Sequence, residues 1–315
     1  METKHIILLI VVIVILIYFS LSYLMYLKVF TRKGYGQIAF VDHEDPFFAE
    51  SKAWYDRAPK EVMKIHGYDG TLLTGVFLPS YDEKSNNIAI VMHGYQSQAT
   101  DMIFIARMYN NMGFKVMMVD QRGHGNSEGS RTGFGQIERY DLRKWIHYAL
   151  RTYGSQDQIL LHGVSMGAAT VMLAANMALP NNVKLVVADC GFTTLRKLFF
   201  HTTHPKIALA LYPGVSCINF YFNRFFLGSV SPLIAIRKSK LPLFLIHGKM
   251  DHKVPFAMAE QLLETSKAPF KELFAVDDAN HTEAFIKAKA ALEQRLFIVI
   301  KKFFSIHKNV IKQMK

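Results

Sequence analysis

Gly163-Val164-Ser165-Met166-Gly167 is the stretch that decides how this chain of 315 residues folds. The apolar run Ile159-Leu160-Leu161 precedes it, and the helix-forming residues 168–175 follow it. This order predicts a buried strand, a sharp turn and a helix, which is the context of a G-x-S-x-G nucleophile elbow. Such a turn exposes the Ser165 hydroxyl at the carboxyl end of the strand, above the positive end of the helix dipole. Ser165 is therefore the predicted nucleophile.

A serine hydroxyl needs a base that takes its proton and a carboxylate that orients the base. Asp251 follows the apolar run at 241–246, and His281 follows the run at 271–276, so both are predicted just past the carboxyl ends of strands. The chain order serine, acid, histidine is the order that accompanies this elbow. We expect Asp251 to orient His281, and His281 to activate Ser165.

Other interpretations of these side chains stay open. Asp251 is also placed to cap a helix that starts near Pro255, and Asp277 or Asp278 is an alternative acid. His252 directly follows Asp251 and cannot easily turn back to it, whereas His307 lies in the tail.

Two backbone N–H groups are needed to stabilise the negative oxygen that forms during attack on a carbonyl. Met166, the residue after the nucleophile, is expected to supply one. Tyr95 is expected to supply the other, because it lies in the loop His93-Gly94-Tyr95-Gln96 after the apolar run at 88–92. Its side chain would then line an acyl pocket. The alternative is an ordinary loop between a strand and a helix.

Short apolar runs and longer helical stretches alternate along most of the chain. This alternation predicts an α/β fold with a mostly parallel sheet covered by helices on both faces. Strands are predicted at 88–92, 115–119, 159–162, 184–188, 241–246 and 271–276, and helices at 98–112, 138–152, 166–178, 256–267 and 282–304. Residues 62–66 and 72–78, joined through Asp69-Gly70, are predicted to form an antiparallel hairpin at one edge.

From about residue 61 to residue 304 the chain resembles the α/β-hydrolase superfamily. It is most similar to bacterial membrane-anchored serine hydrolases related to monoacylglycerol lipases and prolyl-oligopeptidase-type enzymes. The segments that carry the resemblance are Tyr68-Asp69-Gly70, His93-Gly94-Tyr95, residues 120–127, the elbow, Ser231-Pro232, His247-Gly248 with Asp251 and Val254-Pro255, and His281. The resemblance implies an α/β-hydrolase fold, in which residues 120–127 form a structural loop near the active site and Arg122 and His124 belong to the scaffold.

Residues 190–230 interrupt the alternation of strands and helices. In the fold that the resemblance implies, an insertion here forms a short helical cap over the active-site mouth. The insertion is rich in aromatic side chains, namely Phe199, Phe200, Tyr212, Phe220, Tyr221, Phe222, Phe225 and Phe226. An apolar cap suits an acyl chain better than a sugar or a phosphate. The alternative is that these aromatic side chains only fix the cap to the core.

The amino-terminal residues 6–27 carry no charge, and only two serines and three tyrosines interrupt their aliphatic run. This length predicts a transmembrane helix. We therefore expect a membrane anchor at residues 1–30 and a hydrolase domain at residues 31–315, on a single-pass protein of the cell membrane. A signal peptide cleaved near Ser20-Leu21-Ser22 is the alternative. Lys28, Arg32 and Lys33 slightly favour a cytoplasmic domain, but the side of the membrane stays open.

The charge and the cysteine count narrow the choice of partners. The formal net charge is +12, and from residue 284 onward eight Lys or Arg residues face one Glu. This basic end is interpreted either as a final helix with a solvated tail or as a surface for anionic lipid. Nucleic acid is not expected, because aromatic base-reading motifs are absent from the sequence. The two cysteines, Cys190 and Cys217, lack metal-site spacing and are expected to be free thiols. The chemistry requires no metal and no cofactor.

The residues predict a serine hydrolase of the carboxylesterase or lipase kind, which cleaves lipophilic or short-chain esters through an acyl-enzyme. A peptidase or an acyl-thioesterase with the same Ser165, His281 and Asp251 is the alternative. A peptidase also needs a group that fixes a substrate amine, and no such group is identified in the sequence. A membrane-anchored binding protein without activity is a third possibility, which the complete set of three residues disfavours.

Overall fold

The computed structural model describes residues 3–31, 46–307 and 310. Arg32 and Lys33, which entered the prediction of membrane orientation, lie outside these residues, as do Lys308, Lys312 and Lys315 of the basic end. The described chain divides into two compact units. One unit holds residues 1–31 and 194–230, and the other holds residues 32–193 and 231–315. The sequence did not predict that residues 194–230 group with the amino-terminal helix.

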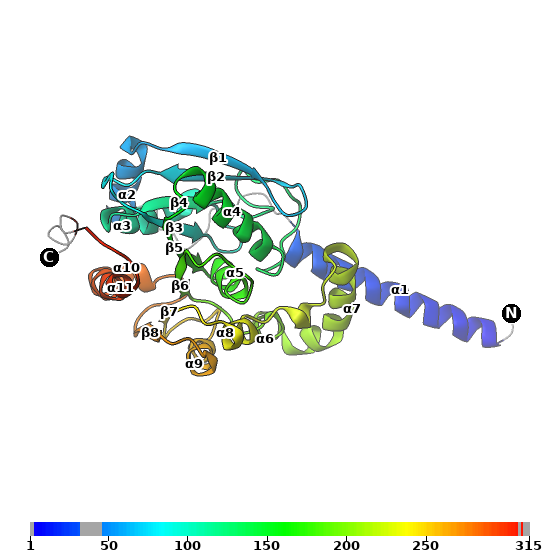
Figure 1. The fold of residues 1–315 in the computed structure, drawn as a ribbon. Helices are drawn as coiled ribbons and strands as arrows, with labels where there is room; N and C mark the ends of the chain where they lie inside the picture. Colours follow the sequence, from blue (N-terminus) through cyan, green and yellow to red (C-terminus); the bar gives the residue numbers. More distant parts are fainter. Residues whose placement is uncertain (1–2, 32–45, 308–309, 311–315) are drawn as a thin grey trace. The chain divides into compact units, whose positions relative to one another are not determined.

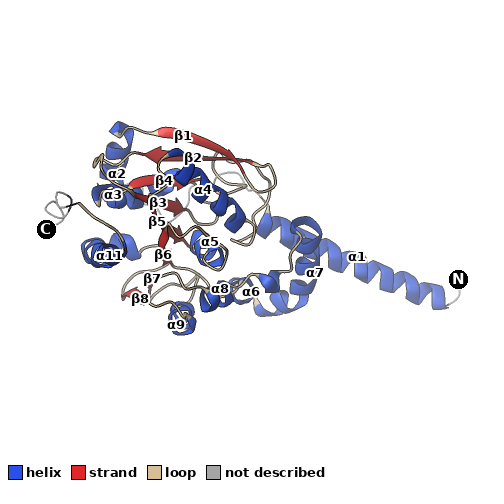
Figure 2. Ribbon diagram, in the orientation of Figure 1, coloured by secondary structure: helices blue, strands red, loops and turns tan. Residues whose placement is uncertain are grey.

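The larger unit is built on one sheet of eight strands (Figures 1 and 2). The strands are β1 (Glu61–His66), β2 (Leu72–Leu78), β3 (Asn87–Met92), β4 (Lys115–Val119), β5 (Gln158–Val164), β6 (Val183–Asp189), β7 (Leu243–Gly248) and β8 (Lys271–Val276). Their order is β1-β2-β4-β3-β5-β6-β7-β8. β2 runs antiparallel to β1 and to β4, and the other neighbours are parallel. The predicted edge hairpin and the predicted parallel sheet are confirmed.

Helices cover both faces of this sheet. The helices of the larger unit are α2 (Pro46–Arg57), α3 (Ile103–Asn111), α4 (Glu138–Thr152), α5 (Met166–Ala174), α8 (Pro232–Lys238), α9 (Phe256–Thr265), α10 (Ala284–Lys287) and α11 (Lys289–Phe303). A short 3₁₀ turn, η1 (Ala99–Met102), precedes α3. α2, α3 and α11 pack into the apolar core on one face, and α4, α5, α8 and α9 pack into the core on the other. Both faces of the central strands are therefore buried, which explains why their sequences are runs of apolar residues.

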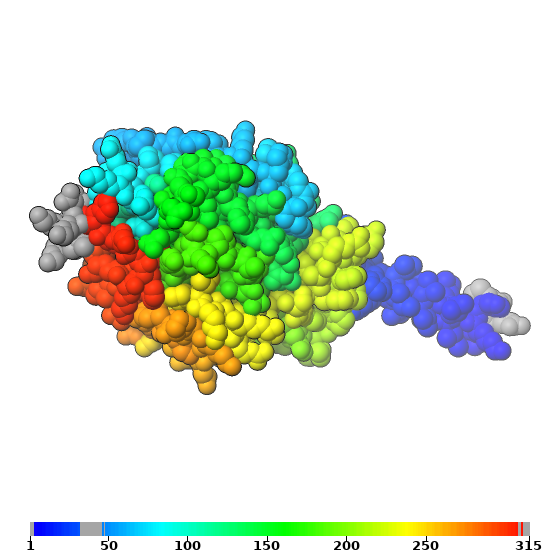
Figure 3. Space-filling model, viewed as in Figure 1, coloured from blue at the N-terminus to red at the C-terminus, as the bar shows by residue number. Residues whose placement is uncertain are grey.

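The smaller unit consists of α1 (Thr3–Phe30), α6 (Leu195–Thr202), α7 (Pro205–Asn223) and the 3₁₀ turn η2 (Leu227–Ser229). Thr194 caps α6, since its side chain accepts a hydrogen bond from the Lys197 N–H. Pro205 at the first turn fixes the start of α7. α1 is long and apolar enough to cross a membrane, with a mean hydropathy of 3.0 and only 6% of its most apolar window buried. Figure 3 shows the amino-terminal part of α1 without side chains of α6 or α7 over it on the visible face.

Candidate active site

Ser165 lies between the last residue of β5 and the first residue of α5, as the sequence predicts. Its backbone has φ 54° and ψ −109°, which is a costly conformation for a residue with a side chain. The two motif glycines allow the close approach that this turn requires. A Cβ atom at Gly163 would overlap the backbone of Gly167, and one at Gly167 would overlap the carbonyl oxygen of Met92.

Two hydrogen bonds join Ser165, His281 and Asp251, which lie far apart in the sequence. His281 Nε2 is 3.0 Å from Ser165 Oγ, and His281 Nδ1 is 2.7 Å from Asp251 Oδ2. Asp251 follows the end of β7 and His281 follows the end of β8, at the sheet edge where β5 ends in the elbow. The structure thus brings the three predicted residues together.

The Asp251 carboxylate is held on both oxygens. Its Oδ1 accepts the backbone N–H groups of Lys253, at 2.9 Å, and Val254, at 2.7 Å. His247 Nε2 lies 3.3 Å from Oδ2. Burial alone would raise the pKa of Asp251, but the hydrogen bonds from His247 and His281 hold that pKa below its usual range. The ionised carboxylate favours the His281 tautomer with a proton on Nδ1, which leaves Nε2 free to accept a proton from Ser165.

The loop that carries Tyr95 is fixed by His93. The Gln121 N–H donates to His93 Nε2 at 2.9 Å, so His93 Nδ1 carries the proton and donates to the Gly94 carbonyl at 2.7 Å. Burial lowers the pKa of His93 to about 3, which keeps this imidazole neutral. The Tyr95 ring stacks on Phe134, with ring centroids 5.2 Å apart.

Met166 begins α5, and an N–H in the first turn of a helix has no acceptor within the helix. The N–H groups of Tyr95, after β3, and of Met166, at the start of α5, therefore lie in the two segments where the sequence predicts the oxyanion donors. Their role in stabilising an oxyanion stays a prediction.

The predicted scaffold loop is tied to its surroundings by three carboxylates, of which Asp120 and Asp141 are buried and Asp69 is exposed. Arg122 donates through Nε to Asp141 at 2.7 Å and through Nη1 to Asp69 at 2.9 Å. Asp120 accepts the Ala99 N–H at 2.7 Å and the Asn126 N–H at 2.9 Å. These contacts support the interpretation of this segment as scaffold.

Cys190 lies beside the catalytic candidates Asp251 and His281. The sequence did not predict this position of Cys190. Its thiol, an Asp251 oxygen and a His281 nitrogen all lie within 4.8 Å of one another. Burial, followed by the charges of Asp189 and Asp251, raises the pKa of Cys190 well above its usual value. Asp251 and His281 bond to each other at 2.7 Å, and the second Asp251 oxygen accepts two backbone N–H groups, so the groups that a metal would use already have partners. The group therefore fits a proton-transfer site better than a metal site. Cys190 directly follows β6, so the sequence could have predicted that it lies at the carboxyl ends of the parallel strands, where Asp251 and His281 also lie.

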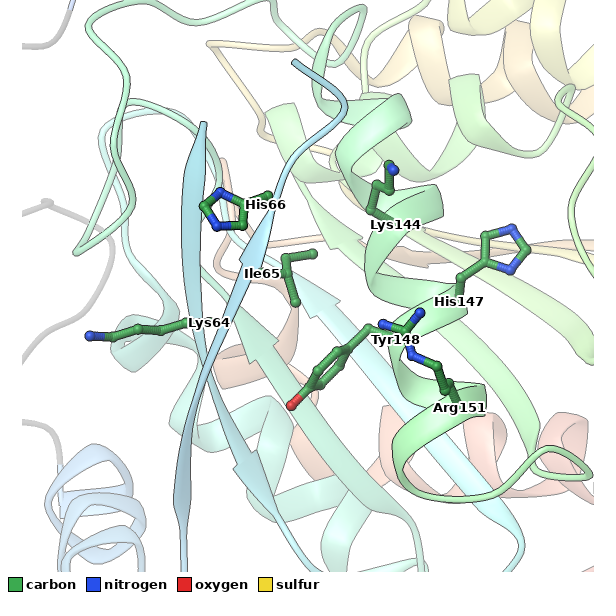
Figure 4. A pocket seen from close by; sticks show the side chains of 7 residues that line it. All are labelled: Lys64, Ile65, His66, Lys144, His147, Tyr148 and Arg151. Atoms are coloured by element: carbon green, nitrogen blue, oxygen red, sulfur yellow. The ribbon is translucent and has the colours of Figure 1, made fainter. Parts of the chain in front are cut away.

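A separate pocket of about 390 Å³ lies between β1 and α4 (Figure 4). It is lined by Lys64, Ile65, His66, Lys144, His147, Tyr148 and Arg151. Figure 4 shows Lys64 pointing away from α4, so the basic groups do not converge on one point. This lining contains no serine, cysteine or carboxylate, and it does not include any of the predicted catalytic residues.

Comparisons with known proteins show what the chain is similar to and support its fold. Residues 83–213 match the family described as "Serine aminopeptidase, S33". The uncharacterized protein YqkD of Bacillus subtilis is 26% identical over 229 residues, which cover 72% of this chain and 73% of the relative. The uncharacterized membrane protein YNL320W of Saccharomyces cerevisiae is 25% identical over 59% of this chain and 61% of its own length. Among solved structures, the Pyrococcus furiosus esterase Pf2001 superposes with a TM-score of 0.65 at 24% identity, covering 79% of this chain and 94% of the esterase.

Proposed function

Because the chain is an α/β hydrolase by fold, we propose that it is a serine hydrolase that cleaves carboxylic esters through a Ser165–His281–Asp251 triad. One observation carries the proposal: the hydrogen bonds run without interruption from the Ser165 hydroxyl through His281 to an ionised, buried Asp251. This constellation converts a weak hydroxyl nucleophile into one that attacks carbonyl carbon.

The reaction proceeds in two halves. Ser165 Oγ attacks the ester carbonyl while His281 Nε2 takes the hydroxyl proton, and Asp251 stabilises the resulting imidazolium. The N–H groups of Tyr95 and Met166 stabilise the oxyanion. His281 then returns the proton to the departing alcohol, which leaves an acyl-serine. Water, activated by His281, attacks that acyl group and releases the carboxylic acid.

Lipophilic acyl esters are the proposed substrate class. The aromatic composition of residues 190–230 and the membrane-length helix α1 support it, because both suit an apolar substrate. The protein is proposed to be a single-pass protein of the cell membrane, with α1 as anchor. A peptidase or thioesterase with the same triad is the second candidate, and the matching aminopeptidase family favours testing the peptidase first.

A fluorophosphonate probe tests the nucleophile directly, since it reacts with activated serine. The full chain in detergent should be labelled, whereas Ser165→Ala should not. Ser155→Ala is the matched control, because Ser155 is exposed on the loop before β5, and it should be labelled like the wild type. Equal labelling of the wild type and Ser165→Ala would refute the assignment. Parallel assays with p-nitrophenyl esters, acyl thioesters and aminoacyl arylamides then separate the three candidate reactions.

A further inference from the structure

α1 and α7 pack against each other within one compact unit (Figure 1). Ser22, Tyr26 and Phe30 are the buried residues of α1, and their spacing of four places them on one face of the helix. Tyr18 continues this face, and its hydroxyl accepts the Gly214 N–H of α7 at 2.9 Å. A Cβ atom at Gly214 would overlap Ser22, so the two backbones approach closely at this point.

Aromatic contacts continue the packing toward the carboxyl end of α1. The Tyr26 ring stacks on Phe222, with centroids 5.3 Å apart and an interplanar angle of 18°. Tyr23 lies 6.2 Å from the same Phe222 ring. Asn223 Nδ2 donates to the Tyr26 hydroxyl at 3.3 Å. The phenols of α1 therefore have partners on α7, although they interrupt an apolar run.

A groove of about 350 Å³ lies between the two helices. It is lined by Phe19, Tyr23, Cys217, Ile218, Tyr221 and Phe222. None of these six side chains carries a formal charge at neutral pH, and most are apolar or aromatic. Tyr221 is 67% exposed and Tyr23 is 42% exposed, so the groove opens to the surroundings of the helix pair.

The position of the groove along α1 sets its depth in a bilayer. Residues 6–27 form the uncharged stretch of α1, and at about 1.5 Å per residue their length matches a hydrocarbon core of about 30 Å. Phe19 and Tyr23 lie inside this stretch, so a membrane-spanning α1 places the groove at the level of lipid acyl chains near one interface.

We propose that this groove between α1 and α7 binds an acyl chain of a membrane lipid. Its continuity with the exposed apolar surface of the anchor helix identifies the occupant, because lipid hydrocarbon surrounds that part of α1 in a bilayer wherever α7 does not cover it. The uncharged lining suits an acyl chain, and the α7 face beside it exposes further apolar side chains, including Leu209 at 71% and Phe220 at 42%. The inference rests on α1 spanning the membrane and not on the hydrolase reaction.

Cys217 permits a direct test, because it is the exposed one of two cysteines while Cys190 is buried. The full chain is reconstituted in phosphatidylcholine vesicles, and Cys217 is labelled with bimane. A nitroxide placed along the lipid acyl chain should quench this bimane more strongly than aqueous iodide supplied on both sides of the membrane. The control is Glu260→Cys in a Cys217→Ser background, since Glu260 is exposed on α9, and its bimane should respond to iodide. Stronger quenching of Cys217-bimane by iodide would overturn the proposal.

Occupancy of the groove is tested by electron spin resonance of spin-labelled phosphatidylcholine. Wild-type protein should give a motionally restricted lipid component that Cys217→Trp loses, because the indole fills the groove. Leu9→Trp is the matched control, since Leu9 is 51% exposed on α1 outside the groove, and this variant should keep the component. Equal components in the two variants, or efficient crosslinking of Cys217 to Cys217 of a second copy by a bismaleimide, would overturn the proposal. Retained fluorophosphonate labelling of both variants shows that they fold, and it distinguishes a failure here from a failure of the proposed reaction.

Discussion

The substitution Asp251→Asn tests whether Asp251 orients His281 or only stabilises the loop that carries it. The variant keeps an oxygen that accepts the N–H groups of Lys253 and Val254, so the loop after β7 should stay folded. On the other side, an amide group replaces the carboxylate oxygen that lies 2.7 Å from His281 Nδ1. The amide can donate to Nδ1, and this favours the tautomer that carries its proton on Nε2. Such a tautomer cannot accept the Ser165 proton.

The loss in rate follows from the negative charge of Asp251, which no longer stabilises the His281 imidazolium in the variant. Two unit charges about 4 Å apart interact by about 4 kcal/mol at an effective dielectric constant of about 20. At about 1.4 kcal/mol for each factor of ten, this corresponds to about 10³-fold in rate. The unfavourable tautomer adds to the loss, and Asp→Asn in a comparable triad costs about 10⁴-fold. We therefore expect kcat for a p-nitrophenyl ester to fall by between about 10³-fold and about 10⁴-fold.

Asp277→Asn and Asp278→Asn are the matched controls for this assay. Both carboxylates are exposed, and they pair with Lys249 at 2.6 Å and with Lys287 at 3.7 Å. Exposed pairs contribute at most about 1 kcal/mol to stability, so both variants should keep nearly normal turnover. Near-normal turnover in Asp251→Asn, combined with a large loss in either control, would refute the reasoning and place the acid on the loop after β8.

Three further predictions concern stability, metal dependence and substrate length. Burial lowers the pKa of His93 and of His162 to about 3 and raises the pKa of Asp189 to about 7. Each histidine takes up a proton on unfolding between about pH 6.5 and about pH 3, whereas Asp189 releases one between about pH 7 and about pH 4. The free energy of unfolding should therefore fall by a net of about 1.4 kcal/mol for each pH unit between about pH 6 and about pH 4. Tryptophan fluorescence measures this, because Trp54 and Trp145 both lie in the larger unit, and an unchanged slope in His162→Gln would contradict the explanation. Ester turnover should be insensitive to EDTA, since Asp251 and His281 bond to each other, and a loss that zinc restores would instead identify a metal site. Finally, each added acyl methylene buried against an aromatic surface is worth about 0.8 kcal/mol, so kcat/KM should rise about fourfold for each carbon until the pocket is full. A wild-type preference for acetyl esters would remove the lipophilic substrate class.

Most of the larger unit was predictable, because local patterns decide its elements. Buried parallel strands appear as short apolar runs, and the hairpin of β1 and β2 follows from the Asp69-Gly70 turn. The main differences lie at helix ends. The predicted helix at 98–112 begins as the 3₁₀ turn η1, and the predicted helix at 282–304 is interrupted at Ala288 between α10 and α11. α2 was not predicted. Its sequence, PFFAESKAWYDR, mixes aromatic and charged residues without a clear helical period.

The three catalytic candidates were predictable for a topological reason. Parallel strands end at one sheet edge, so the residues just after β5, β7 and β8 must lie near one another. Cys190, which follows β6, obeys the same rule. Its proximity to Asp251 was missed because cysteine spacing along the chain says nothing about approach across a sheet. The pKa shifts of Asp189 and His93 could also not be predicted from the sequence, since they depend on burial by residues distant in the chain.

The sequence of α1 indicates that one face of this helix is packed, but it does not identify α7 as the helix that covers this face. Tyr18, Ser22 and Tyr26 recur every four residues in a largely aliphatic helix, and polar groups in such a helix mark a packed face. Small residues permit close packing, and Gly214 is one, but several segments offer glycine. Only the structure shows that Gly214 donates to Tyr18 and that Phe222 stacks on Tyr26. Removal of residues 1–30 would therefore bare the aromatic face of α7, so the full chain is the form in which this unit keeps its packing.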